Sequence, residues 1–416
     1  MSKIKIRNFG PIRNDNDWID IKKVTVFIGN QGSGKSTVAK LISTFSWIEK
    51  ALTRGDYNEK HFQRKGTLKN QYLSYHRIEN YFTYSDKQQS TEIDYVGDAY
   101  HIKYSNGNCK ITKTNNGEYN LPQIMYVPAE RNFISNVKKA KALKLVSDSL
   151  VEFVTEFDNA KNDMKGAVQL PVNNINVEYD RLNDTVNLKG KDYKLKLTEA
   201  SSGLQSLVPL YIVSEYLANS IRSMNEKKVV TSSEERERFR KDVEAIWTDK
   251  NLNDEQKRIA ISTLSKKFNK SAFINIIEEP EQNLFPSSQW ELLKKLLEFN
   301  NYNIPNKLIL TTHSPYLVNY LSIAIQAEYI WEKIKNDEKA SKLRTGLENI
   351  IPQKSLIKSS DVIVYQIDEK EGIIGKLPNP EGIPSDNNFL NNSLIESNDM
   401  FDKLLEIQQR YEFFQT

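Results

Sequence analysis

The sequence predicts an α/β fold built on a parallel sheet, and the spacing of its apolar segments carries that prediction. Three apolar runs, residues 24–28, 273–277 and 307–312, have the length and composition of buried strands. Polar residues end each run, and a segment with helix-compatible spacing follows. Strands and helices that alternate in this way are typical of parallel sheets. The chain has 416 residues, 38% of them hydrophobic, which is enough for a large core.

Composition excludes several classes of protein. A single cysteine, Cys109, excludes an internal disulfide. No apolar run approaches the roughly 20 residues of a membrane span, and no signal-peptide pattern begins the sequence. We therefore expect a cytoplasmic protein with no membrane partner. The formal net charge of +4 permits contact with nucleic acid without requiring it.

The first apolar run leads into GNQGSGKST, residues 29–37. This stretch matches the P-loop pattern G-x-x-x-x-G-K-[ST], in which small residues let backbone N–H groups surround a phosphate. We expect Lys35 to neutralise the β- and γ-phosphates of ATP and Ser36 to supply its hydroxyl to Mg²⁺. A plain glycine turn is the alternative, and the flanking strand and helix argue against it. The candidate nucleotide-binding residues are Gly29, Asn30, Gln31, Gly32, Ser33, Gly34, Lys35, Ser36 and Thr37.

The second apolar run ends in EEPE, residues 278–281. We expect Glu278 to hold Mg²⁺ through water, and Glu279 to polarise the water that attacks the γ-phosphate. Taken alone, such a motif is more often an acidic turn after a strand. The P-loop earlier in the chain is what favours the catalytic interpretation.

The third apolar run ends at His313. A histidine on its own is more often structural than catalytic. In an open α/β sheet, however, the carboxyl ends of the strands face the ligand crevice, so we expect His313 to bind the γ-phosphate. The remaining histidines, His61, His76 and His101, lack metal-ligand spacing and are interpreted as surface or packing residues.

Between the first two runs lies LTEASSGLQS, residues 197–206, followed by an apolar segment. The serines and glycine predict the start of a helix. A serine hydroxyl and free N–H groups at such a start form a second anion site, able to face a γ-phosphate bound by another subunit. The candidate residues of this site are Ser202, Gly203 and Gln205.

Taken in order, these motifs resemble those of ABC-type ATPase heads. The opening KIKIRNFGPI, residues 3–12, is similar to the first strand of RecF, SMC and OLD proteins. Residues 278–286, together with THSP at 312–315, resemble the OLD-like ATPases, which include those of bacterial anti-phage systems. The resemblance extends to about residue 321. It implies an ABC ATPase head with an antiparallel β subdomain and a helical insertion.

The segment YVPAER, residues 126–131, also resembles this group and places Glu130 where transporter-type heads carry the Q-loop glutamine. Three positions depart from the usual ABC pattern. Leu204 replaces the second glycine of the LSGGQ signature, Glu278 replaces the Walker B aspartate, and Phe285 stands where related proteins often have histidine. These departures separate the chain from transporters more than from ATP hydrolysis.

The resemblance implies that two heads pair as a homodimer, or within a higher homo-oligomer. ATP and Mg²⁺ would lie between the P-loop of one head and Ser202 and Gly203 of the other. Hydrolysis would remove the γ-phosphate that bridges the subunits and so change the affinity for a partner.

We expect residues 1–416 to form one discontinuous ATPase head. Alternating runs at 91–96 and 100–104 predict antiparallel strands, and residues 72–82 are interpreted as a helix that packs in the core. The charged insertion lacks sustained heptads, which excludes an SMC-type arm. The expected parts are an antiparallel β and helical region at 50–120, a signature-helix lobe at 135–272 with its charged helical insertion at about 220–270, and a C-terminal hairpin and closing helix at 322–416.

Two functions remain open. The first is an OLD-like ATPase that hydrolyses ATP and regulates a separate effector, a nuclease or toxin, in anti-phage defence or a toxin–antitoxin system. A separate effector is expected because the segment after His313 is too short for the Toprim domain of OLD nucleases. The second is a RecF-like ATPase of DNA repair or recombination, whose dimer clamps DNA through Lys138, Lys139 and Lys141. Salt-dependent DNA binding that requires ATP would favour the second.

Overall fold

The structure is a computed structural model, and it describes residues 2–13, 17–85, 88–114, 119–137, 147–227, 241–246, 248–249 and 270–415. Its centre is a six-stranded sheet in the order β17-β16-β3-β15-β14-β9. The strands are β3 (Val24–Gly29), β9 (Pro122–Val127), β14 (Ala272–Glu278), β15 (Lys307–Thr312), β16 (Val362–Ile367) and β17 (Ile374–Lys376). All neighbours pair in parallel except β17, which is antiparallel to β16. The predicted parallel sheet is confirmed.

The register of this sheet brings the predicted site residues to one edge. Thr312 at the end of β15 pairs with Ile28, and Glu278 at the end of β14 pairs with Thr311. The strands therefore end nearly level, and the segments that follow them share the carboxyl edge.

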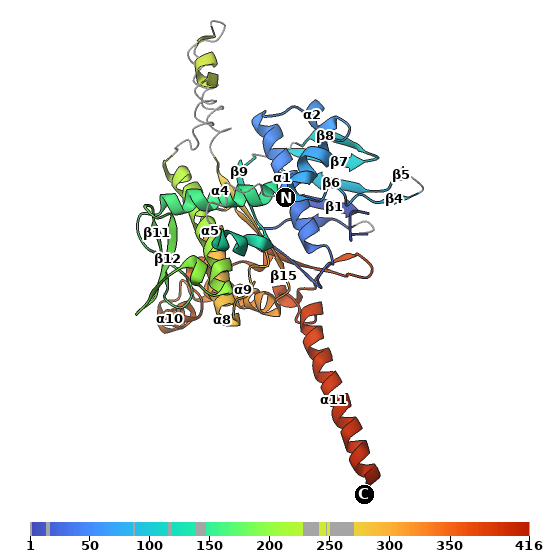
Figure 1. Cartoon of the computed structure of the whole chain (residues 1–416), viewed down its shortest axis with the longest axis vertical. Coiled ribbons are helices and arrows are strands. Elements are labelled where there is room, and N and C mark those ends of the chain that lie inside the picture. Colours follow the sequence, from blue (N-terminus) through green and yellow to red (C-terminus); the bar gives the residue numbers. More distant parts are fainter. Residues whose placement is uncertain are drawn as a thin grey trace.

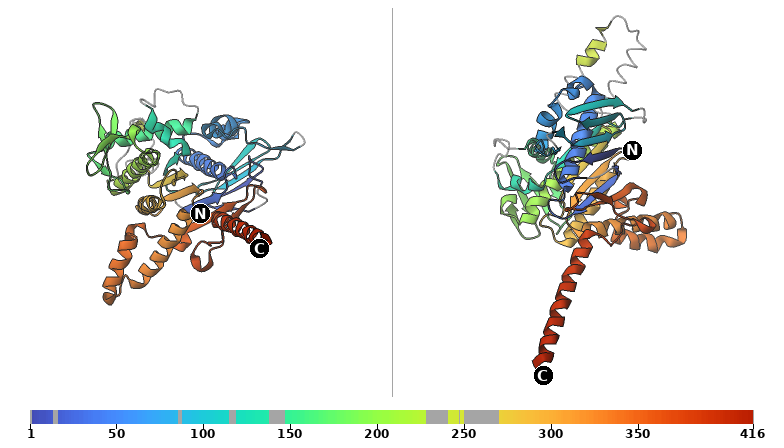
Figure 2. Two further views of the ribbon diagram at one scale, coloured as in Figure 1. Left: turned by 60° about the horizontal axis from the view of Figure 1, so that its bottom comes forward. Right: turned by 90° about the vertical axis from the view of Figure 1, so that its right-hand side faces the viewer.

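A long helix and a second sheet cover one face of the central sheet (Figures 1 and 2). The helix is α1 (Lys35–Arg54), and its side chains are buried around most of its circumference. The second sheet is antiparallel, in the order β2-β1-β6-β7-β8. Its strands are β1 (Lys3–Arg7), β2 (Ile19–Asp20), β6 (Glu92–Val96), β7 (Tyr100–Ser105) and β8 (Asn108–Lys113). The antiparallel strands predicted at 91–96 and 100–104 are confirmed.

A buried carboxylate joins α1 to this second sheet. Glu49 of α1 accepts hydrogen bonds from the Tyr95 hydroxyl at 2.9 Å, from the Ala99 N–H at 2.7 Å and from the Tyr100 N–H at 3.2 Å. Burial raises the pKa of Glu49 despite these donors. Because these donors come from β6, β7 and the turn between them, the carboxyl fixes where the helix lies against the sheet.

Helices and a small sheet cover the opposite face. The helices are α4 (Asp148–Asp163), α5 (Ser202–Lys227), α8 (Pro286–Asn301) and α9 (Pro315–Ile334), and α10 (Ser341–Ile350) packs against α9. The small sheet consists of β10 (Val168–Gln169), β11 (Asn176–Asp180), β12 (Thr185–Lys189) and β13 (Lys194–Lys196), with antiparallel pairing throughout. Apolar side chains of α4, α5 and α8 pack with those of β14 in one core. The parallel sheet thus lies between two apolar cores.

Short elements complete the description. They are α2 (Glu59–Gln63), η1 (Leu68–Leu73), η2 (Ser74–His76), β4 (Tyr84–Ser85), β5 (Gln88–Gln89), η3 (Ala129–Asn132), α3 (Phe133–Asn136), η5 (Leu197–Glu199), η6 (Glu338–Ala340), η7 (Gln353–Ser355), η8 (Ser359–Asp361) and η9 (Pro380–Gly382). The helix expected at 72–82 is only partly present. The η1 segment is a π-helix, and the helical path ends at Arg77, which has a left-handed φ of 59°.

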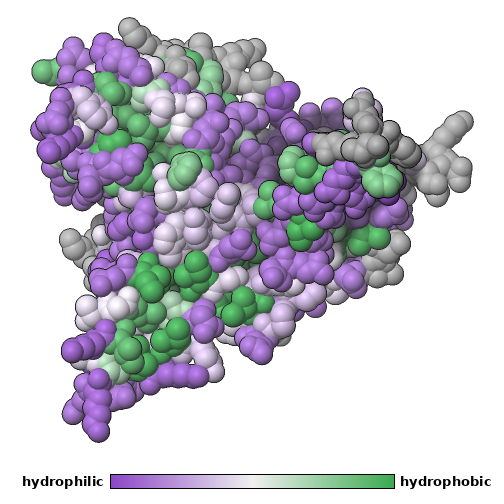
Figure 3. Space-filling model, turned by 90° about the horizontal axis from the view of Figure 1, so that it is seen from below, coloured by the Kyte–Doolittle hydropathy of each residue, from purple (hydrophilic) through white to green (hydrophobic). Residues whose placement is uncertain are grey.

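The last helix, α11 (Phe389–Gln415), points away from the body instead of closing over it (Figure 1). The predicted hairpin before it is present, since β16 pairs with β17. Seen from below, apolar side chains gather on the protruding pair of helices α9 and α10 (Figure 3). No helix among the described ranges is long and apolar enough to cross a membrane.

Candidate nucleotide-binding site

The P-loop sequence forms the predicted strand, loop and helix. It begins at Gly29, the last residue of β3, and reaches Lys35, the first residue of α1. Gly34 caps the helix with a φ of 109°, and a Cβ there would lie 3.0 Å from side-chain atoms of Pro11 and Ile12. Only glycine suits both this conformation and this contact. The loop thus presents backbone at the start of a 20-residue helix, where the N–H groups and the helix dipole attract a phosphate.

The lysine of the loop lies folded into it. Lys35 Nζ donates hydrogen bonds to the carbonyl oxygens of Gly29 and Asn30, both at 2.8 Å. Burial lowers the pKa of Lys35 to about 8, although the charges of Glu279 and Glu281, among others, oppose the shift. A bound polyphosphate would place further negative charge beside this ammonium and so stabilise its protonated form.

Glu278 is the last residue of β14, and only 4% of its surface is exposed. One carboxylate oxygen, Oε2, accepts from the Ala129 N–H at 3.2 Å, and the other, Oε1, has no hydrogen-bond partner among the described residues. Ser33 Oγ in the P-loop is likewise buried without a partner. A buried polar atom without a partner costs free energy, so both atoms fit a site completed by a ligand.

Glu279 and His313 lie together, as their strand ends predict. His313 Nε2 is 3.5 Å from Glu279 Oε1. The hydrogen bond from His313 and the nearby charges, Lys35 among them, lower the pKa of Glu279. Glu279 has a left-handed φ of 43°, a conformation that L-residues adopt only at a cost. The chain therefore holds an ionised carboxylate in a strained position beside a histidine.

Arg131, whose role was not predicted from the sequence, holds that strained position in place. Its side chain is 0% exposed, and burial lowers the pKa of Arg131 to about 10. The guanidinium donates to the carbonyl oxygens of Glu278 at 2.7 Å and Glu279 at 2.6 Å. It also donates to the carbonyls of Pro128 and Ser206, both at 3.2 Å. One side chain thus connects the end of β14 with η3 and α5.

Glu281 is a second residue whose part was not predicted. Its Oε1 accepts from the backbone N–H of His313 at 2.7 Å, and burial raises the pKa of Glu281. Glu281 therefore fixes the start of the segment that carries the histidine. Glu279 lies beside the imidazole ring of His313, whereas Glu281 binds the main chain of the same residue. The two glutamates therefore contact different parts of His313.

The signature segment lies at the start of α5. Ser202 is the first residue of the helix and is exposed, whereas Gly203 is buried. A Cβ on Gly203 would lie 2.5 Å from the carbonyl oxygen of Asn283, in the loop that follows Glu279. Gln205 Nε2 donates to the Thr198 carbonyl at 3.2 Å. Ser202 is thus open to a partner, while Gly203 and Gln205 contact their own chain.

Glu130 lies in η3, directly after β9, and is exposed. Because β9 is parallel to β14, this places Glu130 at the same edge as Glu278. Its proposed Q-loop role stays a prediction.

Other sequence predictions concern parts of the chain beyond the site. Lys138, Lys139 and Lys141, the basic residues of the DNA-binding alternative, lie outside the described residues, as does most of the insertion at 220–270. Within the described ranges, no group of three or more His, Cys, Asp or Glu side chains could hold a metal ion by itself. A magnesium ion bound through nucleotide phosphates typically uses only one or two protein carboxylates and keeps several waters, so it does not require such a group.

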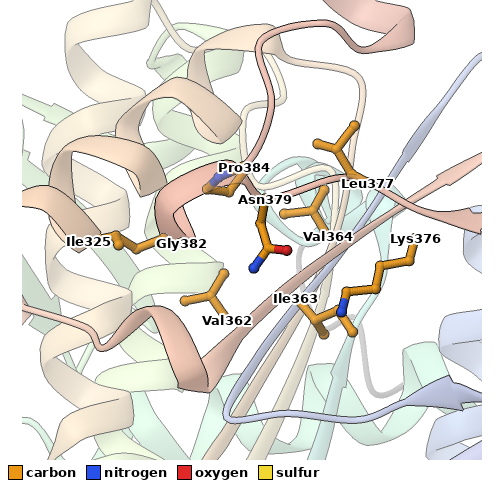
Figure 4. Close-up of a pocket in the computed structure, with 9 residues that line it drawn as sticks. All are labelled: Ile325, Val362, Ile363, Val364, Lys376, Leu377, Asn379, Gly382 and Pro384. Atoms are coloured by element: carbon orange, nitrogen blue, oxygen red, sulfur yellow. The ribbon is translucent and has the colours of Figure 1, made fainter.

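A small pocket between α9 and β16 does not belong to this site (Figure 4). Val362, Ile363 and Val364 line it, and they form the beginning of β16. The P-loop follows the end of β3, which is parallel to β16. The pocket therefore lies at the amino edge of the sheet, opposite the candidate nucleotide site.

Comparison with known proteins gives one family match. The family described as AAA ATPase domain matches residues 253–318, the region that contains β14, α8 and β15. Among curated proteins none matches the chain.

Solved structures with similar folds include three kinds of ATPase. The SMC head domain from Thermotoga maritima is 10% identical, with 90% of this chain and 97% of that chain covered and a TM-score of 0.37. The recombination mediator protein RecF is 12% identical, with 90% and 97% covered and a TM-score of 0.30. A nucleotide-free ATP-binding cassette from an ABC transporter is 12% identical, with 92% and 94% covered and a TM-score of 0.29.

The fold assignment rests on the topology itself, because these TM-scores are low. A P-loop follows β3 within a parallel sheet, an acidic strand end follows at β14, and an antiparallel sheet covers α1. This is a P-loop ATPase fold of the ABC and SMC type, and the predicted fold class is confirmed.

Proposed function

We propose that the chain is an ABC-type ATPase that binds ATP with Mg²⁺ at the carboxyl edge of its parallel sheet. The observation that carries the proposal is the meeting of Lys35, Glu278, Glu279 and His313 at that edge, from three separate strands. Each has a place suited to a polyphosphate, its metal or its attacking water.

In this mechanism the chain's own residues bind and orient the substrate. Lys35 neutralises the β- and γ-phosphates, and the N–H groups of the P-loop surround them. Ser36 and Glu278 would hold Mg²⁺, which polarises the phosphate oxygens when it is bound. Glu279 orients and polarises the water, and His313 contacts the γ-phosphate while it keeps Glu279 ionised.

We further propose that ATP joins two copies head to tail and that the dimer regulates a separate effector protein, a nuclease or toxin. The exposed Ser202 at the start of a 26-residue helix supports the first step, because it offers an anion site to a second head. Exposed apolar residues on α9 and α10, such as Ile330, Leu343 and Ile350, support a protein partner. The resemblance to OLD-like defence ATPases favours that kind of effector.

Measurement of the molecular mass in solution tests whether ATP joins two copies of the chain. Glu279→Gln, which should bind ATP without hydrolysing it, is expected to double in mass when ATP and Mg²⁺ are added. The double variant Glu279→Gln, Ser202→Arg is expected to bind ATP and remain a monomer, because the added side chain blocks the second anion site. Dimerisation of both variants, or of neither, would contradict this arrangement.

Measuring ATP turnover with and without duplex DNA distinguishes effector regulation from a RecF-like function. A turnover rate that does not change with DNA supports the effector proposal. ATP-dependent DNA binding that weakens steeply with salt would support the RecF-like alternative instead.

The pH dependence of ATP binding follows from Lys35. The free site has a lysine with a pKa of about 8, and bound phosphates raise that pKa, so binding takes up a proton above pH 8. Affinity should therefore be constant near neutral pH and fall by about tenfold per unit above pH 8. Titration of a fluorescent ATP analogue between pH 6.5 and 9.5 measures this, with Lys35→Arg as the control. The arginine stays charged, so its weaker affinity should not change over that range. A flat profile for the native chain would exclude Lys35 as the phosphate ligand.

A further inference from the structure

A second cavity lies beside α1, away from the P-loop, and aromatic side chains line it. It encloses about 240 Å³ between α1, η1, η2, β9 and α4. Trp47 and Tyr72 form one wall, with ring centroids 5.4 Å apart. His76 and Tyr126 form another, with centroids 4.6 Å apart. The Trp47 and Tyr72 rings are tilted against each other and the His76 and Tyr126 rings meet edge-on, and aromatic walls of this kind suit a flat ligand.

Two residues that line this cavity, His76 and Tyr126, have buried polar atoms without a hydrogen-bond partner among the described residues. His76 is 2% exposed, and neither of its buried ring nitrogens has a hydrogen-bond partner within the part of the chain that the structure describes. Burial, with a smaller contribution from Lys40, lowers the pKa of His76 to about 3, so the ring is neutral. A neutral imidazole has one N–H donor and one acceptor nitrogen. Leaving both unused costs free energy, which a ligand in the cavity would recover.

The charges at the cavity limit what can enter. Glu152 of α4 lines it and accepts a hydrogen bond from the Tyr75 hydroxyl, which leaves further acceptor sites on the carboxylate. Among the described residues that line the cavity, none is Lys or Arg. An anionic group would therefore be disfavoured here, and an N–H donor favoured.

The volume sets the size of the ligand. An apolar cavity of about 150 Å³ admits one benzene ring. A space of about 240 Å³ therefore admits two fused rings. We propose that this cavity is a binding site for a neutral, planar nitrogen heterocycle of the purine type, free or as its nucleoside. The ring stacks against Trp47 and Tyr72, Glu152 accepts its N–H donors, and His76 completes its hydrogen bonds.

The site is separate from the nucleotide site along the same helix. Ser43, which lines the cavity, lies seven residues beyond Ser36, about 10 Å along α1. Tyr126 connects the two sites, because burial and the nearby charge of Glu278 raise the pKa of its hydroxyl. We therefore expect the heterocycle to bind in the presence of ATP.

Calorimetric titration of the full-length chain with guanosine, adenosine and guanosine monophosphate tests the proposal. Guanosine should bind most tightly, because its base offers two adjacent N–H donors to one carboxylate. Guanosine monophosphate should bind more weakly because of its charge. ATP at saturating concentration should leave guanosine binding in place. Absence of saturable binding for all three probes, or direct competition by ATP, would overturn the proposal.

Two variants locate the binding. Glu152 is exposed, so Glu152→Gln should fold normally and weaken guanosine binding by about 10- to 100-fold. Trp47 is 37% exposed, and Trp47→Leu should weaken binding of both nucleosides about equally, since it removes stacking without removing hydrogen bonds. Glu156→Gln, one turn further along α4, is the matched control and should bind guanosine as the native chain does. Equal affinity in Glu152→Gln and the native chain would place the ligand elsewhere.

Discussion

Replacing Glu279 by glutamine is expected to lower the turnover number for ATP by about 100- to 10,000-fold, the contribution typical of a general base. Glutamine has nearly the same shape, so it keeps the main-chain contacts with Arg131 and Thr311. It loses the negative charge that polarises the water. The affinity for ATP should change little, because Lys35 and the P-loop bind the phosphates. Steady-state turnover and ATP affinity, measured on the same preparation, separate these effects.

Two controls make this result specific. Glu332→Gln on the exposed side of α9 removes the same charge far from the site and should leave turnover unchanged. Glu281→Gln should retain the hydrogen bond from the His313 N–H and lose less activity than Glu279→Gln, because Glu281 positions the chain. Full activity of Glu279→Gln would exclude this carboxylate as the base. A loss of affinity equal to the loss of turnover would indicate a binding role instead.

The sequence was sufficient to predict the parts of the site that depend on local pattern. A strand that ends in glycine or glutamate can be recognised from a few consecutive residues, and parallel pairing brings such ends together. For this reason Lys35, Glu278, Glu279 and His313 could be placed at one edge before the structure was known.

Features that depend on distant pairing could not be predicted in this way. The strand at 362–367 was expected only as half of a hairpin, and the structure also pairs it with β3, more than 330 residues earlier in the chain. The local sequence does not show whether an apolar run pairs only within a hairpin or also joins a strand far away in the chain. The strands β10 to β13 were missed because they are short and mostly half-exposed, so they lack a clear apolar alternation. Arg131 was missed because arginine is mostly exposed in proteins, and only the folded chain reveals the carbonyls that it binds.

Arg131 is expected to have the largest effect on stability. Arg131→Met keeps an apolar stem of similar length but removes a guanidinium that donates to the carbonyls of Pro128, Ser206, Glu278 and Glu279. Those acceptors would be left without their charged donor in a buried region, next to the carboxylates of Glu278 and Glu279. Removing one partner from such a buried network typically costs about 3–5 kcal/mol of the free energy of unfolding. Urea denaturation of the native chain and the variant measures the difference.

The variants that accompany Arg131→Met distinguish charge from geometry. Arg131→Lys retains the charge, but a single ammonium cannot reach carbonyls that come from η3, α5 and the end of β14, so we expect an intermediate loss of stability. Arg181→Met is the surface control. It removes a guanidinium that donates to the Asn162 carbonyl at 2.7 Å in an exposed position, and should lower the free energy of unfolding by less than about 0.5 kcal/mol.

Turnover must then be measured on the folded fraction of Arg131→Met. Because Arg131 holds the main chain of Glu279 in its left-handed conformation, that fraction should bind ATP and hydrolyse it slowly. Native turnover in the folded variant would show that the strained position of Glu279 persists without the arginine, and would separate the stability of the site from its catalytic geometry.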